Sequence, residues 1–398
     1  MGRLGLCVLA AFALVSAVQA AEAPVVATQF RGGPAHLGVF AGPPAGNLDK
    51  VLWRFQTGHM VSASPTVADG VVYVGSRDGY FYALDEATGR PRWKVRADAG
   101  VTSSAAISDG LVWFQSDANT LYALHVKDGS VAWKRGLGSS IAFVSAYPES
   151  GLADYWTSSP MLYGGRLYIG GGDGAVHALD ARTGKPLWTY QTKGRVRATP
   201  ATDGERVYAG SFDGVMYALD INTGALAWSF KTQGNDVFPV GHIQSSPAVA
   251  DGKVIFGSRD FRLYALDART GKEAWKLQHE GSWIISSPAV SGEAVCIGGS
   301  DTQMEQCLDI RTGKELWRTG IRNNIFSSAA IAGERLYTGS FMGGAVAFRM
   351  SDGQIVGFNI ADGRSNSSPW IDNGVLFIGS DNGSVYAFAD KPHDKPKG

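Results

Sequence analysis

Eight near-copies of one short segment run through this 398-residue chain, and this repetition limits the folds open to it more than any other feature. The clearest copy spans Ser62–Trp93 and reads SASPTVADGVVYVGSRDGYFYALDEATGRPRW. The copies recur with a mean period of about 43 residues. A repeat of this length is one supersecondary unit that cannot bury its own apolar faces, so the units must stack on one another.

Each copy can be read as four short β-strands. In the first copy we expect strands at Pro65–Ala68, Val71–Ser76, Tyr80–Asp85 and Pro91–Lys94, because the residues alternate and are rich in β-branched and aromatic types. Asp-Gly and Thr-Gly dipeptides separate the strands, since Gly readily adopts the positive φ of tight turns. No helical periodicity of any length is present. We therefore predict an all-β fold: a single eight-bladed β-propeller of four-stranded antiparallel blades.

The two ends of the repeat region predict how the ring closes. The last unit ends near Phe388 with no fourth strand after it, whereas Val51–Phe55, around Trp53, has a fourth-strand sequence with no unit before it. We expect this N-terminal strand to complete the last blade and so remove the open edge. The unit at Gln354–Phe358 is also irregular, because it lacks the Trp that marks seven other fourth strands.

The chain outside the propeller is short. Residues 1–20 resemble a secretory signal peptide, with Arg3 before an apolar run and small residues up to Ala20. The apolar run is too short for a comfortable membrane span, and no later stretch is long enough, so we expect no membrane insertion. Residues 21–50 form an N-terminal extension, residues 51–390 the propeller and residues 391–398 a flexible tail. The signal predicts a periplasmic or secreted protein.

Cys296 and Cys307 are expected to form a disulfide. Aligned with the first unit, they take the places of Tyr73 and Ala83, which face each other across a hairpin centred near Asp78. Directly opposed strand positions bring the Cβ atoms close enough for a bond, and an exported protein meets oxidising conditions.

Composition and motifs exclude several functions. The 36 Lys and Arg residues balance 36 Asp and Glu residues, which argues against a nucleic-acid-binding protein. No phosphate-binding loop and no nucleophile elbow occurs. The His residues are scattered without ligand spacing, so we expect no metal site. We assign no catalytic residue.

The consensus V-Y-V-G-S-x-D-G-x-L-Y-A-L-D-x-x-T-G-x-x-x-W resembles the pyrroloquinoline-quinone-type β-propeller repeat over Val51–Phe388. The resemblance implies one of two functions. Quinone-dependent dehydrogenases carry the cofactor over the propeller axis, whereas the propeller lipoprotein of the outer-membrane β-barrel assembly machinery is a scaffold without catalysis. The chain lacks the adjacent Cys pair of many alcohol-oxidising members, and it also lacks a lipoprotein box.

A candidate ligand site lies where the first strands approach the axis. The residues three and five positions before each Pro65-like position differ between units, while their surroundings are constant. They could bind a small anion or a peptide segment, or they could line a water-filled channel. The candidate funnel residues are Arg195, Arg197, His242, Gln244, Trp283, Asn324, Arg364 and Asn366.

A candidate partner-binding surface lies in two enlarged connections on the same face. Insertions on one face of a rigid ring often carry binding, and aromatic residues dominate binding hot spots. The alternative is that the loops pack on the blades. The expected anchors are Phe143, Tyr147, Tyr155, Trp156 and Phe238.

Together these features predict an exported, monomeric, non-catalytic scaffold that binds a protein partner of the cell envelope, in keeping with the assembly propeller. The alternative is an oxidoreductase that binds pyrroloquinoline quinone with calcium, or another small ligand, in the central funnel.

Overall fold

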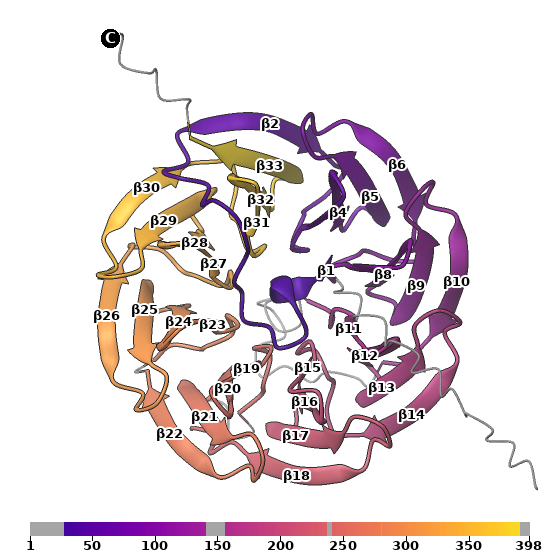
Figure 1. Cartoon of the computed structure of the whole chain (residues 1–398), viewed down its shortest axis with the longest axis vertical. Coiled ribbons are helices and arrows are strands. Elements are labelled where there is room, and N and C mark those ends of the chain that lie inside the picture. Colours follow the sequence, from indigo (N-terminus) through magenta and orange to yellow (C-terminus); the bar gives the residue numbers. More distant parts are fainter. Residues whose placement is uncertain (1–27, 141–155, 237–240, 280, 391–398) are drawn as a thin grey trace, which may run out of the picture.

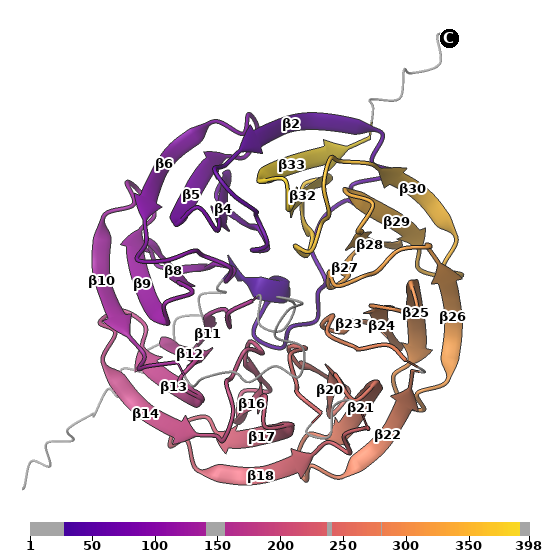
Figure 2. The ribbon, with the colours of Figure 1, turned by 180° about the vertical axis from the view of Figure 1, so that it is seen from behind.

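The computed structural model describes residues 28–140, 156–236, 241–279 and 281–390. They form eight β-sheets arranged as a ring around a central axis, as Figures 1 and 2 show from the two faces. The first strand of each sheet lies nearest the axis and the fourth lies at the rim. The predicted eight-bladed propeller is confirmed.

Blade I matches the strands expected from the sequence to within two residues. It consists of β3 (Thr66–Ala68), β4 (Val71–Gly75), β5 (Tyr80–Asp85) and β6 (Pro91–Arg96) in antiparallel order. Blades II to IV are β7 (Ala106–Ser108), β8 (Leu111–Gln115), β9 (Thr120–His125) and β10 (Val131–Gly136); β11 (Met161–Tyr163), β12 (Arg166–Gly170), β13 (Ala175–Asp180) and β14 (Pro186–Gln191); and β15 (Ala201–Thr202), β16 (Arg206–Gly210), β17 (Val215–Asp220) and β18 (Leu226–Lys231).

The remaining blades repeat the same order. Blades V to VII are β19 (Ala248–Ala250), β20 (Lys253–Ser258), β21 (Arg262–Asp267) and β22 (Glu273–Gln278); β23 (Ala289–Ser291), β24 (Ala294–Gly299), β25 (Met304–Asp309) and β26 (Glu315–Gly320); and β27 (Ala330–Ala332), β28 (Arg335–Gly339), β29 (Ala345–Arg349) and β30 (Ile355–Asn359). Blade VIII is β31 (Trp370–Asp372), β32 (Val375–Gly379), β33 (Ser384–Ala389) and the N-terminal strand β2 (Lys50–Gln56).

Ring closure occurs as the sequence predicts. Strand β2 pairs antiparallel with β33, from Lys50 opposite Ala389 to Gln56 opposite Ser384. The first strand of the propeller region therefore completes the last blade.

Tryptophans on the fourth strands join neighbouring blades. The indole N–H of Trp53, for example, donates to the Glu86 carbonyl of blade I at 2.8 Å, and the ring lies against Gly89. A Cβ at Gly89 would lie 2.6 Å from that ring, which explains why a Gly recurs at this turn in blades I to VII. The same indole bond recurs for six more residues: Trp93, Trp133, Trp188, Trp228, Trp275 and Trp317.

The joint between blades VII and VIII is built differently, because Gly357 stands where the Trp would be. The backbone of Asn47 fills this space and lies 2.2 Å from a Cβ placed on Gly357. Tyr337 Oη donates to the Gly46 carbonyl at 3.0 Å, and Asn359 Nδ2 donates to the Leu48 carbonyl at 2.7 Å. The N-terminal chain thus replaces the missing indole.

The remainder of the N-terminal extension crosses one mouth of the ring as a strap, residues 28–49 (Figure 1). It contains the short strand β1 (Thr28–Gln29), which pairs with β7, and a 3-10 turn η1 (Phe30–Gly32). Backbone N–H groups on the inner strands of the next blades donate to strap carbonyls. These bonds run from Thr202, Val249, Val290 and Ile331 to Pro34, Ala35, Leu37 and Gly38. The strap therefore ties several blades together at the axis.

Arg31 anchors the strap and is almost fully buried. Its guanidinium donates to the carbonyls of Ala329 (2.5 Å) and Pro288 (2.7 Å). Gly38 makes room for it, because a Cβ there would lie 2.3 Å from Arg31 Nη2. A buried cation without such partners would be strongly destabilising.

The expected disulfide is present. Cys296 on β24 and Cys307 on β25 stand directly opposite each other, with their Cα atoms 4.0 Å apart. No helix in the described part of the chain has the length and apolar character to cross a membrane.

Candidate functional site

An axial cavity of about 70 Å³ lies inside the ring. Phe30 of the strap contributes to its lining, together with residues three positions before each Pro65-like position in all eight blades. These eight residues are Ser62, Thr102, Thr157, Arg197, Gln244, Ile285, Phe326 and Asn366. The cavity is therefore lined by the variable position that sequence comparison between the units singles out.

A belt of hydroxyl groups encircles the same cavity one position before each Pro65-like residue. Around most of the belt, the backbone N–H of one residue donates to the side-chain oxygen of the next, as from Ser104 to Ser159 at 2.9 Å. Seven such bonds are present among the described residues. The belt consists of Ser64, Ser104, Ser159, Thr199, Ser246, Ser287, Ser328 and Ser368. Small hydroxyl residues are thus required here by blade-to-blade bonding as well as by crowding.

Only some of the predicted funnel residues reach this cavity. Arg197, Gln244 and Asn366 line it. The residues five positions before the Pro65-like position do not; they are Arg195, His242, Trp283, Asn324 and Arg364.

Arg197 carries the positive charge of the cavity wall. Burial lowers its pKa, and the Asp117 carboxylate opposes that change. The pKa of Asp117 is itself raised by burial, although Thr102 donates to its carboxylate at 2.6 Å. Burial also lowers the pKa of Arg195, with a smaller effect from the charge of Arg197. The two guanidinium groups are thus close enough to repel each other.

A third set of funnel residues follows the second strand of each blade, at the variable x of the G-S-x-D-G turn. Arg259, at this position in blade V, is buried and donates to Gln244 Oε1. Its guanidinium lies over the rings of Phe212 (5.4 Å) and Trp283 (5.3 Å). Burial lowers the pKa of Arg259 to about 10.

The same turn position supplies contacts elsewhere in the funnel. Phe212 stacks on His242 at 5.4 Å, and burial lowers the pKa of His242 to about 4, with a smaller effect from Arg259. Phe341 contacts Phe326 at 4.7 Å and lies under the Arg364 guanidinium at 4.9 Å.

Acidic residues at this turn position hold the Asn side chains of the funnel. Asn366 Nδ2 donates to Asp381 at 2.9 Å, and Asn324 Nδ2 lies 3.4 Å from Asp301. The sequence signal for this set was available, because a variable position within an otherwise constant motif is the feature that identified the first-strand residues. It was missed because the turn was interpreted only as structure.

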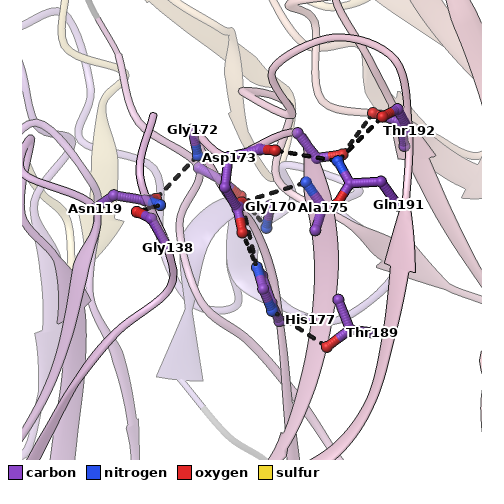
Figure 3. Close-up of polar contacts among 12 residues, drawn as sticks. Asn119, Gly138, Gly170, Gly172, Asp173, Ala175, His177, Thr189, Gln191 and Thr192 are labelled. Atoms are coloured by element: carbon purple, nitrogen blue, oxygen red, sulfur yellow. Dashed lines mark hydrogen bonds and ion pairs between the residues drawn. The ribbon is translucent and has the colours of Figure 1, made fainter. Parts of the chain in front are cut away.

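The Asp that follows x in the G-S-x-D-G turn has structural partners. Figure 3 shows Asp173 accepting from the Ala175 N–H at 3.2 Å and from His177 Nε2 at 3.1 Å. The neighbouring blade is tied to this hairpin, since Asn119 Oδ1 accepts from the Gly172 N–H at 2.9 Å. In blades I, IV and V a Tyr takes the place of His177 and donates to the hairpin Asp. These acids stabilise turns.

The arrangement does not fit a quinone cofactor with a divalent cation. Pockets for cofactor-sized ligands commonly have volumes of roughly 300–1,000 Å³, against about 70 Å³ for this cavity. Within the described ranges, no three His, Cys, Asp or Glu side chains come together as metal ligands would.

Most of the predicted partner-binding anchors lie outside the described residues; these are Phe143, Tyr147, Tyr155 and Phe238. Trp156 is described, and it lines the axial cavity.

A second surface stands out on blade VII. Met342, Phe358 and Ile360 have 60%, 61% and 62% of their surface exposed. With Ile355 and Ile321 they line an apolar groove of about 250 Å³ beside the edge strand β30. We call these five residues the blade VII patch.

At the centre of the patch, Phe358 occupies a position that is polar or charged in the other blades. The residues equivalent to Phe358 are Lys94, Lys134, Thr189, Ser229, Lys276, Arg318 and Arg54. Charged residues on edge strands discourage pairing with other chains. Blade VII lacks this protection, which the sequence signals by the irregular segment around Gly357.

Comparison with known proteins supports the same fold. The crystal structure of BamB from Moraxella catarrhalis is similar at 20% identity, with a TM-score of 0.71 over 86% of this chain and 99% of that chain. A europium-containing methanol dehydrogenase matches at 12% identity, with a TM-score of 0.75 over 91% and 98% of the two chains. The computationally designed Ika8 protein matches at 18% identity, with a TM-score of 0.69 over 87% and 100%. At these identities the likeness shows the fold alone.

No curated protein sequence matches the chain at a significant level. The family model described as outer membrane protein assembly factor BamB matches residues 46–150, 149–322 and 239–392, which together cover nearly all of the propeller. The chain therefore belongs to this family of PQQ-type propeller repeats.

Proposed function

We propose that the chain is a non-catalytic scaffold of the cell envelope that binds a protein partner during outer-membrane protein assembly. Membership of the BamB family supports the envelope and assembly role. The observation that carries the binding role is the blade VII patch, because exposed apolar clusters of this kind commonly mark interaction surfaces.

The geometry of the patch favours an extended partner segment. Strand β30 ends its sheet, so its outer backbone N–H and C=O groups have no strand beside them. Phe358 and Ile360 are two residues apart and equally exposed, which matches the alternation of side chains along a strand. An added strand with apolar residues at alternate positions would bind both the backbone edge and the groove.

Charge substitutions on the patch test this function. In host cells lacking the chromosomal copy, we expect the double variant Phe358→Lys/Ile360→Lys to restore outer-membrane β-barrel proteins several-fold less well than the unaltered chain. Leu316→Lys is the matched control, because Leu316 is 54% exposed on the outer strand of blade VI but lies outside the groove.

Two results would contradict the proposal. If loss of the chain leaves β-barrel protein levels unchanged, the assembly role is wrong. If the double variant and the Leu316→Lys control complement equally, the blade VII patch is not the binding surface. A photo-crosslinker at position 358 gives the independent measurement, since it should label one assembly partner that the same crosslinker at position 316 does not.

The alternative, a quinone-dependent oxidoreductase, is favoured by the likeness to the methanol dehydrogenase and disfavoured by the small axial cavity. Incubation with pyrroloquinoline quinone, calcium, an alcohol and a dye acceptor separates the two functions. We expect neither dye reduction nor a change in the unfolding midpoint.

A further inference from the structure

We propose that the axial cavity is a binding site for a small inorganic anion of about halide size. This site is independent of the blade VII patch and does not depend on the scaffold function. The protons available inside the cavity, its positive charge and its size favour such an ion.

The hydroxyl belt supplies donors. A Ser or Thr side chain has one O–H proton and two acceptor lone pairs. Seven of the eight belt oxygens accept a backbone N–H from the neighbouring blade, so one lone pair of each is occupied. Among the described residues, none of the belt hydroxyls donates a hydrogen bond to another protein group. Their protons are therefore available to a ligand at the axis.

Gln244 adds a donor whose orientation is fixed. Its side chain is buried, and Oε1 accepts from the Arg259 guanidinium. Since a guanidinium can only donate, the atom facing Arg259 must be the oxygen. The Nε2 group is therefore the other end of the amide, and it has no acceptor among the described residues. Gln244 lines the cavity, so this amide needs an acceptor there.

Positive charge completes the site. Arg197 lines the cavity with only 9% of its surface exposed, and its neighbour Arg195 is close enough to feel its charge. Arg259 stands behind Gln244. Two carboxylates face the lining. Asp117 accepts from Thr102 and lies close enough to Arg197 to oppose the lowering of its pKa by burial, and Asp381 accepts from Asn366. A ring of donors beside buried guanidinium groups favours an anion over a metal cation.

The cavity size limits what can bind. A cavity measured in this way needs about 10–15 Å³ to hold one water molecule, so about 70 Å³ admits a halide together with a few ordered waters. Gluconate is a much larger, multiply hydroxylated organic anion, and this makes it a suitable reference ion.

The test uses the full-length protein with sodium bromide against sodium gluconate at equal ionic strength. We expect the unfolding midpoint to rise with the logarithm of the bromide concentration, and crystals soaked in bromide to give an anomalous peak in the axial cavity. Gln244→Glu should weaken bromide binding at least tenfold, because it replaces the donor by a negative charge while keeping the acceptor for Arg259.

The matched control is Gln278→Glu. Gln278 also accepts a guanidinium hydrogen bond, from Arg262 at 3.1 Å, but it is exposed at the rim. It should respond to bromide as the unaltered chain does, and circular dichroism should show that both variants are folded. The proposal is overturned if bromide and gluconate act alike and no peak appears, since the cavity then holds water only. It is also overturned if bromide raises the unfolding midpoints of both variants equally. The same holds if the shift in midpoint depends on the cation of the salt and not on the anion.

Discussion

Single side chains decide where this regular fold departs from its own repeat. Glu305 on β25 stands at a position that is buried and apolar in the other blades, where the residues are Phe81, Leu121, Val176, Met216, Leu263, Ala345 and Val385. It is fully buried, and neither carboxyl oxygen has a partner among the described residues. Burial raises its pKa to about 8, with a smaller opposing effect from Arg31. At neutral pH the folded protein therefore keeps this carboxyl group largely protonated.

We expect Glu305→Gln to change how stability depends on pH. The pKa of Glu305 is higher in the folded chain than the ordinary value of 4.5, so the folded state binds the extra proton between these values. The unaltered protein must lose stability relative to the variant as pH rises from about 5 through 8, by at most about 1.4 kcal/mol per pH unit. Urea unfolding at pH 6.5, 7.5 and 8.5 measures the difference.

The control for this titration is Glu293→Gln, because the Glu293 side chain is 67% exposed and pairs with Arg311 at the surface. Its stability curve should run parallel to that of the unaltered protein. Parallel curves for Glu305→Gln as well would show that the carboxyl group is not held protonated by the fold.

Among the elements, the strap is the one that the repeat does not explain. Its bonds go mostly to backbone groups of the inner strands, and it has no hydrophobic periodicity of its own. The side chain that fixes it, Arg31, gives no sequence signal because its partners are carbonyls of Ala329 and Pro288.

Arg31→Ala should loosen the strap without opening the blades. The substitution leaves two buried carbonyls without donors, and each costs about 1–3 kcal/mol. Hydrogen exchange should accelerate at the Thr202, Val249 and Val290 amides, which donate to the strap. Amides between β5 and β6 should exchange as before, and so should all amides in the control Arg311→Ala, whose side chain is 64% exposed. Unchanged exchange in the strap amides would argue against an anchoring role for Arg31.

The strands could be predicted because each strand type recurs in eight copies of the repeat. An ambiguous copy such as Gln306–Asp309 can therefore be assigned by alignment with the clearer copies. The funnel was predicted in part. Arg197, Gln244 and Asn366 lie three positions before the Pro of their repeats, in the segments that lead into β15, β19 and β31, so the repeat itself marks them. Arg259 lies in a turn whose side-chain direction depends on tertiary contacts. The blade VII patch was not predicted. Its signal is the absence of the charged or polar residue found at the Phe358 position of the other blades, and a missing residue type is harder to recognise in a sequence than a motif that is present.

The ring as a whole is closed by a non-local pairing, that of β2 with β33. Asp390 reinforces it, since its carboxylate accepts from the backbone N–H groups of Asn47 and Leu48, the latter at 3.1 Å. The four blade strands of each other sheet are consecutive in the chain, and the strap strand β1 adds to blade II by pairing with β7. The stability of the ring as a closed body is therefore concentrated at this joint.

Two truncations separate closure from the strap. A chain of residues 50–398 keeps β2 and loses the strap, so we expect it to stay monomeric with a lower unfolding midpoint. A chain of residues 57–398 also loses β2, which leaves β33 as an open edge and should cause self-association. Light scattering coupled to size-exclusion chromatography distinguishes these outcomes. A monomeric, fully stable 57–398 chain would show that the closing strand is dispensable.

The pairing of β2 with β33 also sets an order of events during biosynthesis. β2 leaves the ribosome before any of the blades, yet its partner is the last strand of the propeller to be made. Blades I to VII can form as each hairpin emerges, because their contacts are local. β2 must wait unpaired until Ser384–Ala389 is available. Until then, every newly made molecule exposes the edge of β2, which other chains can pair with. A chaperone that shields one extended strand would protect the maturing protein.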